Sequence, residues 1–221
     1  MIILGLDSAT NACSVVLWRD GAVLARRSAV MRHGQAESLV PMVVAVMAEA
    51  GMTYDALERI AVTVGPGSFT GVRVGLATAR GLGLAAGCPV HGVTTTEALA
   101  HAVPEAERQG HPILVLIDSR RSEPFHQIFS GDLTPLTPPS ALPLEVAMRE
   151  MPPGPFLVTG DGAAAWLPSL GERAHWIGTG GTCDAAILAA IAATRRPEAI
   201  LPAEPLYIRP PDVTVPPPPA P

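Results

Sequence analysis

The stretch VTVGPGSFTGVRVG, residues 62–75, is the feature that most restricts the fold of this chain. A β-type run ends in Gly65-Pro66-Gly67-Ser68, and a helical pattern begins directly after it. A strand that passes through a glycine turn into a helix is the local unit of an α/β protein, and such a turn can hold an anion at the helix N-terminus. The glycines therefore either bind a phosphate or serve another purpose.

Neither of the common phosphate-binding signatures is complete in this stretch. A Walker A loop needs a lysine after its glycines, but all 15 basic residues of the chain are arginine. A Rossmann fingerprint needs a third glycine where Thr70 stands. We therefore expect a tight turn with Ser68 as the helix N-cap. The alternative is a vestigial phosphate site formed by Asp7, Gly67 and Ser68.

Two α/β units follow one another along the chain. The first is expected to contain strands at 2–6, 12–18, 22–27, 60–64 and 89–93, and helices at 35–50, 69–86 and 96–103. The second is expected to contain strands at 112–117, 125–129 and 156–159, and helices at 144–151 and 184–195. Each unit begins with a strand that delivers an aspartate to a turn, Asp7 and Asp118. The pattern predicts a duplicated fold with lobes at 1–105 and 106–214 and a proline-rich tail at 215–221.

The two long helices carry more small and apolar residues than a surface helix needs. In the second helix, Gly71, Gly75, Ala79 and Gly83 recur at every fourth residue and form a ridge. Each glycine costs about 0.5–1 kcal/mol against alanine inside a helix, so the ridge indicates that another backbone approaches closely. Either one helix is central to the chain's own core, or the pair contacts another subunit. We favour the contact with another subunit.

The sequence lacks several catalytic and metal-binding patterns. The six histidines form no HxxxH or HExxH pattern, and the three cysteines form no CxxC pair, so we expect no metal site and expect each histidine at the surface or a helix end. No GxSxG elbow occurs. The charged turn at 118–123 is either a solvated hairpin or a patch where Arg120 and Arg121 bind an acidic or phosphate partner.

The net charge and the length of the apolar runs indicate the cellular compartment and the kind of partner to expect. The net charge is −5, which argues against a stand-alone nucleic-acid binder but not against RNA contact within a complex. The N-terminus has no positively charged region and reaches Asp7 early, which does not fit a signal peptide. The longest apolar run, 39–47, is far short of the roughly 18 residues of a membrane span. We expect a soluble cytoplasmic protein without membrane attachment.

Several segments of the chain together resemble one family. The segments ILGLDSATNACSVVLWRDG, RHGQAESLVPMV and VGPGSFTGVRVGLATARGLG resemble the TsaB (YeaZ) family, and LIDSRRSEPF and PLYIRPPDVT extend the resemblance into the second half. The resemblance implies a duplicated RNase H-like fold of the actin/Hsp70-like ATPase type, with two lobes of mixed sheet and flanking helices. It also implies a non-catalytic scaffold subunit that is required to form N6-threonylcarbamoyladenosine in tRNA.

The resemblance further implies the partners and the surface that binds them. A TsaD-type catalytic subunit would join through the two long helices, a TsaE-type P-loop ATPase would be recruited, and tRNA would be met indirectly. ATP or ADP would enter only through the complex. Whether an isolated chain is a monomer or a homodimer stays open, although an apolar helix pair favours an isologous contact between two copies. Segments 33–47 and 65–83 match the family's two helix segments. The residues expected at the interface are His33, Leu39, Met42, Val43, Val46, Met47, Gly71, Val72, Gly75, Leu76, Ala79 and Gly83.

An enzyme is the alternative function. A degenerate actin-like ATPase or phosphotransferase would use Asp7 and the turn at Gly65 as its own nucleotide site. That hypothesis predicts a further glycine-rich loop late in the chain, for which residues 178–181 are a thin candidate. One departure from the family pattern is Pro124, which stands where a strand residue is usual and puts the pairing of strand 125–129 in doubt.

Overall fold

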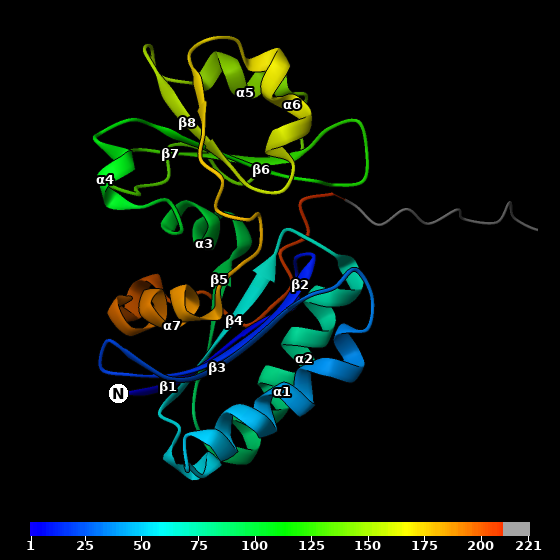
Figure 1. Cartoon of the computed structure of the whole chain (residues 1–221), viewed down its shortest axis with the longest axis vertical. Helices are drawn as coiled ribbons and strands as arrows, with labels where there is room; N and C mark the ends of the chain where they lie inside the picture. The colour runs from blue at the N-terminus through cyan, green and yellow to red at the C-terminus, as the bar shows by residue number, and fades with distance from the viewer. Residues whose placement is uncertain (210–221) are drawn as a thin grey trace, which may run out of the picture.

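Two mixed β-sheets form the two lobes of the computed structural model, which describes residues 1–209 (Figure 1). The first half contains β1 (Ile2–Asp7), β2 (Ala12–Arg19), β3 (Ala22–Val30), α1 (Gln35–Glu49), the 3-10 turn η1 (Tyr54–Ala56), β4 (Arg59–Gly65), α2 (Phe69–Ala86), β5 (Val90–Thr94), α3 (Thr95–His101) and α4 (Glu105–Arg108). The second half contains β6 (Ile113–Ile117), β7 (Phe125–Phe129), α5 (Leu144–Glu150), β8 (Phe156–Thr159), α6 (Ala163–Leu170), β9 (Ala174–Trp176), α7 (Ala185–Thr194) and η2 (Pro197–Ala199). The predicted tail lies outside the described residues.

The strand order confirms the predicted duplication. The first sheet has the order β3-β2-β1-β4-β5 and the second has the order β7-β6-β8-β9. In both sheets the first strand of the unit pairs antiparallel with the second strand and parallel with the strand that follows the unit's first helix, β4 or β8. A further strand is then added in parallel. The second lobe therefore repeats β2-β1-β4-β5 of the first, and β3 is the extra edge strand.

Local turn and capping signals explain why most elements form where they were expected. Asp20 and Gly21 adopt positive φ values of 48° and 93° in the turn between β2 and β3, as a two-residue hairpin requires. The helix α2 ends at Gly87, whose φ of 67° gives the left-handed C-cap that favours glycine. Pro124 does not prevent pairing, because β7 begins at the next residue and pairs with β6 from Phe125 to Phe129. The short elements α4, α6 and β9 were not predicted.

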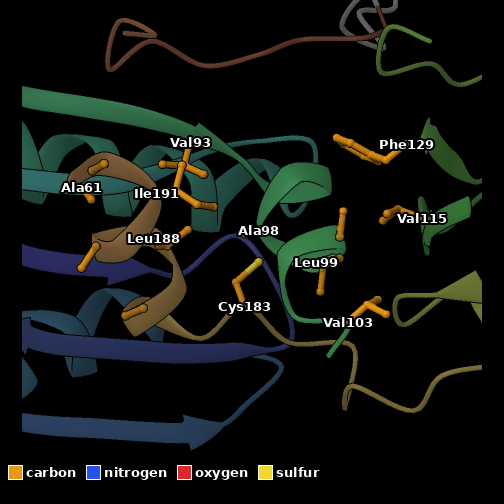
Figure 2. Close-up of a cluster of buried hydrophobic side chains, with 14 of the residues drawn as sticks. Ala61, Val93, Ala98, Leu99, Val103, Val115, Phe129, Cys183, Leu188 and Ile191 are labelled. Atoms are coloured by element: carbon orange, nitrogen blue, oxygen red, sulfur yellow. The ribbon is translucent and has the colours of Figure 1, made fainter. Parts of the chain in front are cut away.

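Three clusters of buried apolar residues hold the layers together. One lies between the first sheet and the helices α1 and α2, which run side by side over the same face (Figure 1). A second lies between the outer face of the second sheet and the helices α5 and α6. The third joins the lobes: Leu188 of α7 belongs to one cluster with Val93 of the first sheet, Leu99 of α3 and Val115 and Phe129 of the second sheet (Figure 2).

The last described residues cross back from the second half to the first lobe. The helix α7 packs on β1, β2, β4 and β5 of the first sheet. The predicted division after residue 105 had assigned this helix to the second lobe. After it, the N–H of Gly92 donates to the carbonyl of Leu201 at 2.9 Å, and the N–H of Leu206 donates to the carbonyl of Val64 at 2.8 Å. Arg209 then reaches the second lobe, where it donates to the carbonyl of Glu123 at 2.8 Å. Residues 201–209 thus bridge the two lobes.

Candidate functional site

The helices α1 and α2 do not present the residues that were expected at a partner interface. Ten of the twelve are buried within the chain itself, namely Leu39, Val43, Val46, Met47, Gly71, Val72, Gly75, Leu76, Ala79 and Gly83. The prediction that these ten residues form a contact surface was wrong, because a residue already enclosed by its own subunit offers no surface to another. Of the remaining two, His33 is exposed and Met42 is half-buried. The binding of a partner by the helix pair stays a prediction.

The glycine ridge of α2 is explained by close approach to the chain's own first lobe. A Cβ atom at Gly71 would lie 2.0 Å from the carbonyl oxygen of Ser8, and one at Gly75 would lie 2.8 Å from the Ser8 hydroxyl. The Ser8 hydroxyl also donates to the carbonyl of Gly71 at 2.8 Å. The inference that another backbone approaches the ridge was therefore correct, but that backbone is the segment after β1.

The opposite sides of the two helices are exposed and carry apolar residues beside the charged Glu37 and Arg80. The apolar part of this surface is here called the outer helix face. On α1 it is formed by Ala36, Val40, Val44 and Ala48, and on α2 by Ala77, Gly81, Leu84 and Ala85. The exposed fractions are 51% for Val40, 53% for Val44 and 88% for Leu84. Spacing by four residues keeps the α1 members on one side of the helix. Exposed apolar residues gathered in one place on neighbouring helices are typical of a surface that another protein covers.

Asp7 is a structural acid at the end of β1. Its side chain is fully buried, and it accepts hydrogen bonds from the Thr63 hydroxyl at 2.7 Å, the Thr10 hydroxyl at 2.9 Å and the N–H of Ala9 at 3.1 Å. Burial raises the pKa of Asp7 to about 6, although these hydrogen bonds act in the opposite direction. Asp7 thus stabilises its own turn through Thr10. The hypothesis that Asp7 faces a phosphate was wrong, because its carboxylate is enclosed.

The glycine turn that was compared with phosphate loops is filled by protein. A Cβ atom at Gly67 would lie 2.4 Å from the carbonyl oxygen of Ala9. The N–H of Ser68 donates to the same carbonyl at 2.8 Å, and the Ser68 hydroxyl accepts from the N–H of Gly71 at 3.3 Å. Ser68 is thus the N-cap of α2, as expected. One side of the turn therefore packs against the segment after β1.

A cleft of about 900 Å³ lies where the two lobes meet. Its first-lobe wall includes residues 9–11, 32–37, 66–70 and 72–73, and its second-lobe wall includes residues 117–121 and Asp161, with residues 206–209 between them. Gly67 and Ser68 line it, whereas Asp7 does not. Residues 178–181, the candidate late loop, do not line it either. The predicted charged turn at 118–123 does reach it.

Polar contacts cross the cleft between the lobes. The Asn11 amide donates to Asp161 at 3.1 Å, and the Arg120 guanidinium donates to the Asn11 amide oxygen at 3.1 Å. Asp161 also accepts from the N–H of Asp118 at 2.9 Å, and burial raises the pKa of Asp161. Asn11 and Asp161 were not predicted as site residues, because no local pattern joins positions 150 residues apart.

An aromatic pair with an arginine stands at the rim of the cleft. The ring centroids of Phe69 and Tyr207 lie 5.9 Å apart, and the Arg73 guanidinium lies 3.7 Å from the centroid of Phe69. Arg73 also donates to the Tyr207 hydroxyl at 3.0 Å. Both rings remain about half exposed, at 52% for Phe69 and 53% for Tyr207. The rim of the cleft therefore holds two aromatic rings that solvent still reaches, with Arg73 over one face of Phe69.

The histidines are placed differently from the expectation. His91 on β5 and His126 on β7 are buried strand residues, so the prediction of surface or helix-end positions was wrong for these two. Burial lowers the pKa of His91 to about 4, with Arg59 and Arg195 acting in the same direction. His101 lies in the last turn of α3, as expected for a helix end. Within residues 1–209, no three His, Cys, Asp or Glu side chains form a group that could hold a metal ion.

The helices of the described region are all too short or too polar to cross a membrane.

Two lobes with the same strand order, joined across a cleft, define the duplicated RNase H-like fold of the actin/Hsp70-like ATPase class. Among solved structures, YeaZ from Pseudomonas aeruginosa matches with a TM-score of 0.81 at 28% sequence identity, covering 93% of this chain and 99% of that chain. A family model described as TsaD, tRNA N6-adenosine threonylcarbamoyltransferase, matches residues 29–133.

The sequence relatives identify the family within this fold class. The Escherichia coli (strain K12) protein named tRNA threonylcarbamoyladenosine biosynthesis protein TsaB is 33% identical over 183 residues, which cover 78% of this chain and 76% of that protein. The Haemophilus influenzae protein of the same name is 35% identical over 130 residues, covering 57% of this chain and 52% of that protein. The chain belongs to the TsaB (YeaZ) family.

Proposed function

We propose that this chain is a non-catalytic scaffold subunit in the biosynthesis of N6-threonylcarbamoyladenosine in tRNA, and that its outer helix face binds a TsaD-type catalytic subunit. Family membership supports the pathway, because the E. coli and H. influenzae relatives are named for it. The match of residues 29–133 to the TsaD model supports a partner of related fold, since related subunits can join through equivalent surfaces.

The exposure of Val40, Val44 and Leu84 is the observation that carries the proposal. Each of these side chains is at least half exposed on two helices that lie side by side. The helices already bury their other sides against the sheet, so a partner can cover the outer helix face without rearranging the core. Docked helices from the partner would bury this apolar area, which is worth about 25 cal/mol for each Å² removed from water.

The enclosed carboxylate of Asp7 supports a scaffold over an ATPase. An acid that positions a water or a metal beside a phosphate must reach the ligand, but Asp7 is occupied by Ala9, Thr10 and Thr63 and does not line the cleft. The enzyme alternative requires ATP hydrolysis by the isolated chain that Asp7→Ala abolishes. The scaffold requires hydrolysis by the complex to depend on its other subunits, with a TsaE-type ATPase recruited to the assembled pair.

Co-purification with the TsaD-type subunit of the same cell tests the scaffold. Val44→Glu places a charge on the outer helix face, where burial by a partner would leave it unpaired, so recovery of the partner should fall at least tenfold. Leu142→Glu is the matched control, because Leu142 is 50% exposed in the second lobe, away from the outer helix face. Full recovery of the partner by a folded Val44→Glu chain would show that the helix pair is not the contact.

The isolated chain offers a second readout of the same surface. With no TsaD-type subunit present, the outer helix face can pair with its own copy by an isologous contact. Sedimentation should then show a dimer that Val44→Glu converts to a monomer and that Leu142→Glu leaves intact. A wild-type chain that is monomeric at every concentration would restrict the surface to the heterologous partner.

A further inference from the structure

The cleft between the lobes has the opposite charge balance from the rest of the chain. The whole sequence carries a net charge of −5, whereas the residues that line the cleft include five arginines and three acids. The arginines are Arg32, Arg73, Arg120, Arg121 and Arg209, and the acids are Glu37, Asp118 and Asp161. A local excess of arginine in an acidic protein attracts anions to that place and repels them elsewhere.

Two of these arginines are not neutralised by a carboxylate within residues 1–209. Arg32 is exposed and makes no ion pair there. Arg73 contacts the Phe69 ring and the Tyr207 hydroxyl, neither of which carries a charge. In contrast, Arg120 lies 3.6 Å from Asp118 and Arg209 lies 3.2 Å from Glu123. Arg32 and Arg73, both on the first-lobe wall, are therefore the charges that a ligand would neutralise.

The half-exposed rings of Phe69 and Tyr207 add a second kind of recognition at the same rim. Arg73 holds both rings in place, because its guanidinium stacks on Phe69 and donates a hydrogen bond to the Tyr207 hydroxyl. Fixed aromatic faces beside cationic side chains are the arrangement with which proteins stack bases of single-stranded nucleic acid and contact its phosphates. The cleft volume of about 900 Å³ suits a ligand of one or two nucleotides.

The exposure of Phe69, Tyr207 and Arg32 favours a strand lying along the rim over a nucleotide enclosed in the cleft. The side of the glycine turn that faces Ala9 and Ser8 is closed, since a Cβ atom at Gly67 or Gly71 would meet the backbone of those residues. We propose that the rim of the cleft binds a single-stranded RNA segment, with one base stacked on Tyr207 and Phe69 and adjacent phosphates at Arg32 and Arg73. The proposal rests on the proposed function, since the substrate of that pathway is a tRNA.

Fluorescence anisotropy with the full-length chain and a fluorescein-labelled RNA hexanucleotide tests the site. Tyr207→Ala should weaken binding about fivefold to a hundredfold, the usual range for loss of one stacked base, while Tyr207→Phe keeps the ring and should bind within twofold of wild type. Arg32→Ala should reduce the slope of log K against log salt by about 0.7, the value of one single-strand phosphate contact. The control is Arg80→Ala, because Arg80 is exposed on α2 and does not line the cleft.

The outcomes separate the RNA site from its competitors. Equal affinity of Tyr207→Ala, Arg32→Ala and Arg80→Ala for the hexanucleotide would overturn the proposal. Tighter binding of AMP or ATP than of the hexanucleotide, measured by competition, would reassign the cleft to a free nucleotide. Unchanged co-purification of Tyr207→Ala with the TsaD-type subunit is expected, so failure here leaves the scaffold intact. Loss of co-purification in Val44→Glu with normal RNA binding is expected for the same reason.

Discussion

Two glycines of α2 provide a matched test of how this helix is held against its sheet. Gly71→Ala and Gly81→Ala both replace glycine by alanine inside the helix, and each gains about 0.5–1 kcal/mol of intrinsic helix stability. Their surroundings differ. A Cβ atom at Gly81 meets nothing within 4 Å, whereas at Gly71 it lies 2.0 Å from the carbonyl oxygen of Ser8 and 3.0 Å from the carbonyl carbon.

The contact at Gly71 sets the size of the effect. Ordinary van der Waals contact begins at 3.4 Å, so the helix and the segment after β1 must separate by about 1.4 Å to admit the methyl group. The atoms of Ser8 that obstruct it belong to the backbone and cannot rotate away. Overpacking of this kind costs about 1–3 kcal/mol, and the 2.8 Å hydrogen bond from the Ser8 hydroxyl to Gly71 is strained as well. After the gain in helix propensity, Gly71→Ala should lose about 1–2 kcal/mol in the free energy of unfolding.

Urea denaturation followed by far-UV circular dichroism measures both variants on one scale. Gly81→Ala should unfold at a higher urea concentration than wild type and Gly71→Ala at a lower one, with equal slopes. Gly75→Ala should lie between them, because its obstacle at 2.8 Å is the rotatable Ser8 hydroxyl. If Gly71→Ala proved as stable as Gly81→Ala, the ridge would not be pressed on Ser8, and the partner-facing interpretation of the ridge would be restored.

Two further predictions concern the buried ionisable groups. Burial raises the pKa of Asp7 to about 6, against 3.8 for the free carboxyl, so between these values the folded chain keeps a proton that the unfolded chain releases. The free energy of unfolding should therefore fall by about 3 kcal/mol as the pH rises from 4 to above 6, and Asp7→Asn should remove that fall in urea titrations at each pH. The thiol of Cys88 should react first with an aromatic disulfide reagent, because it is partly exposed while Cys13 and Cys183 are buried and burial raises the pKa of Cys13 to about 11. Peptide mass spectrometry after partial labelling would contradict this if Cys13 or Cys183 carried the first label.

The elements that could be predicted from the sequence are those whose signals are local. The turn at Asp20 and Gly21 needs positive φ at adjacent residues, and the sequence Asp-Gly supplies it. The ends of α2 were predicted at the observed residues, because Ser68 caps one end and Gly87 the other. In contrast, β9 is only three residues long and is held by pairing with β8, so nothing within its own sequence indicates it.

Residues that meet only in the folded chain were the ones missed or misplaced. The periodicity of Gly71, Gly75 and Gly83 shows that one side of α2 is small, but it does not tell which backbone lies against that side. For the same reason the exposed side of α1, with Val40 and Val44, was not the side chosen from the sequence. The cleft contacts are further examples, since Arg73 and Tyr207 are 134 residues apart along the chain.

The duplication gives each lobe an equivalent glycine turn. In the first lobe the turn after β4 begins at Gly65, with a φ of 105°, and in the second lobe the turn after β8 begins at Gly160, with a φ of 103°. Each turn closes on the end of the first strand of its own unit, or just beyond it. A Cβ atom at Gly160 would lie 2.1 Å from the carbonyl of Leu116, and one at Gly67 would lie 2.4 Å from that of Ala9. A phosphate would need those same positions, with free N–H groups around it. Protein backbone lies against these glycines in both lobes, so they serve close packing, and the outer helix face and the rim of the cleft are the surfaces that we propose for recognition.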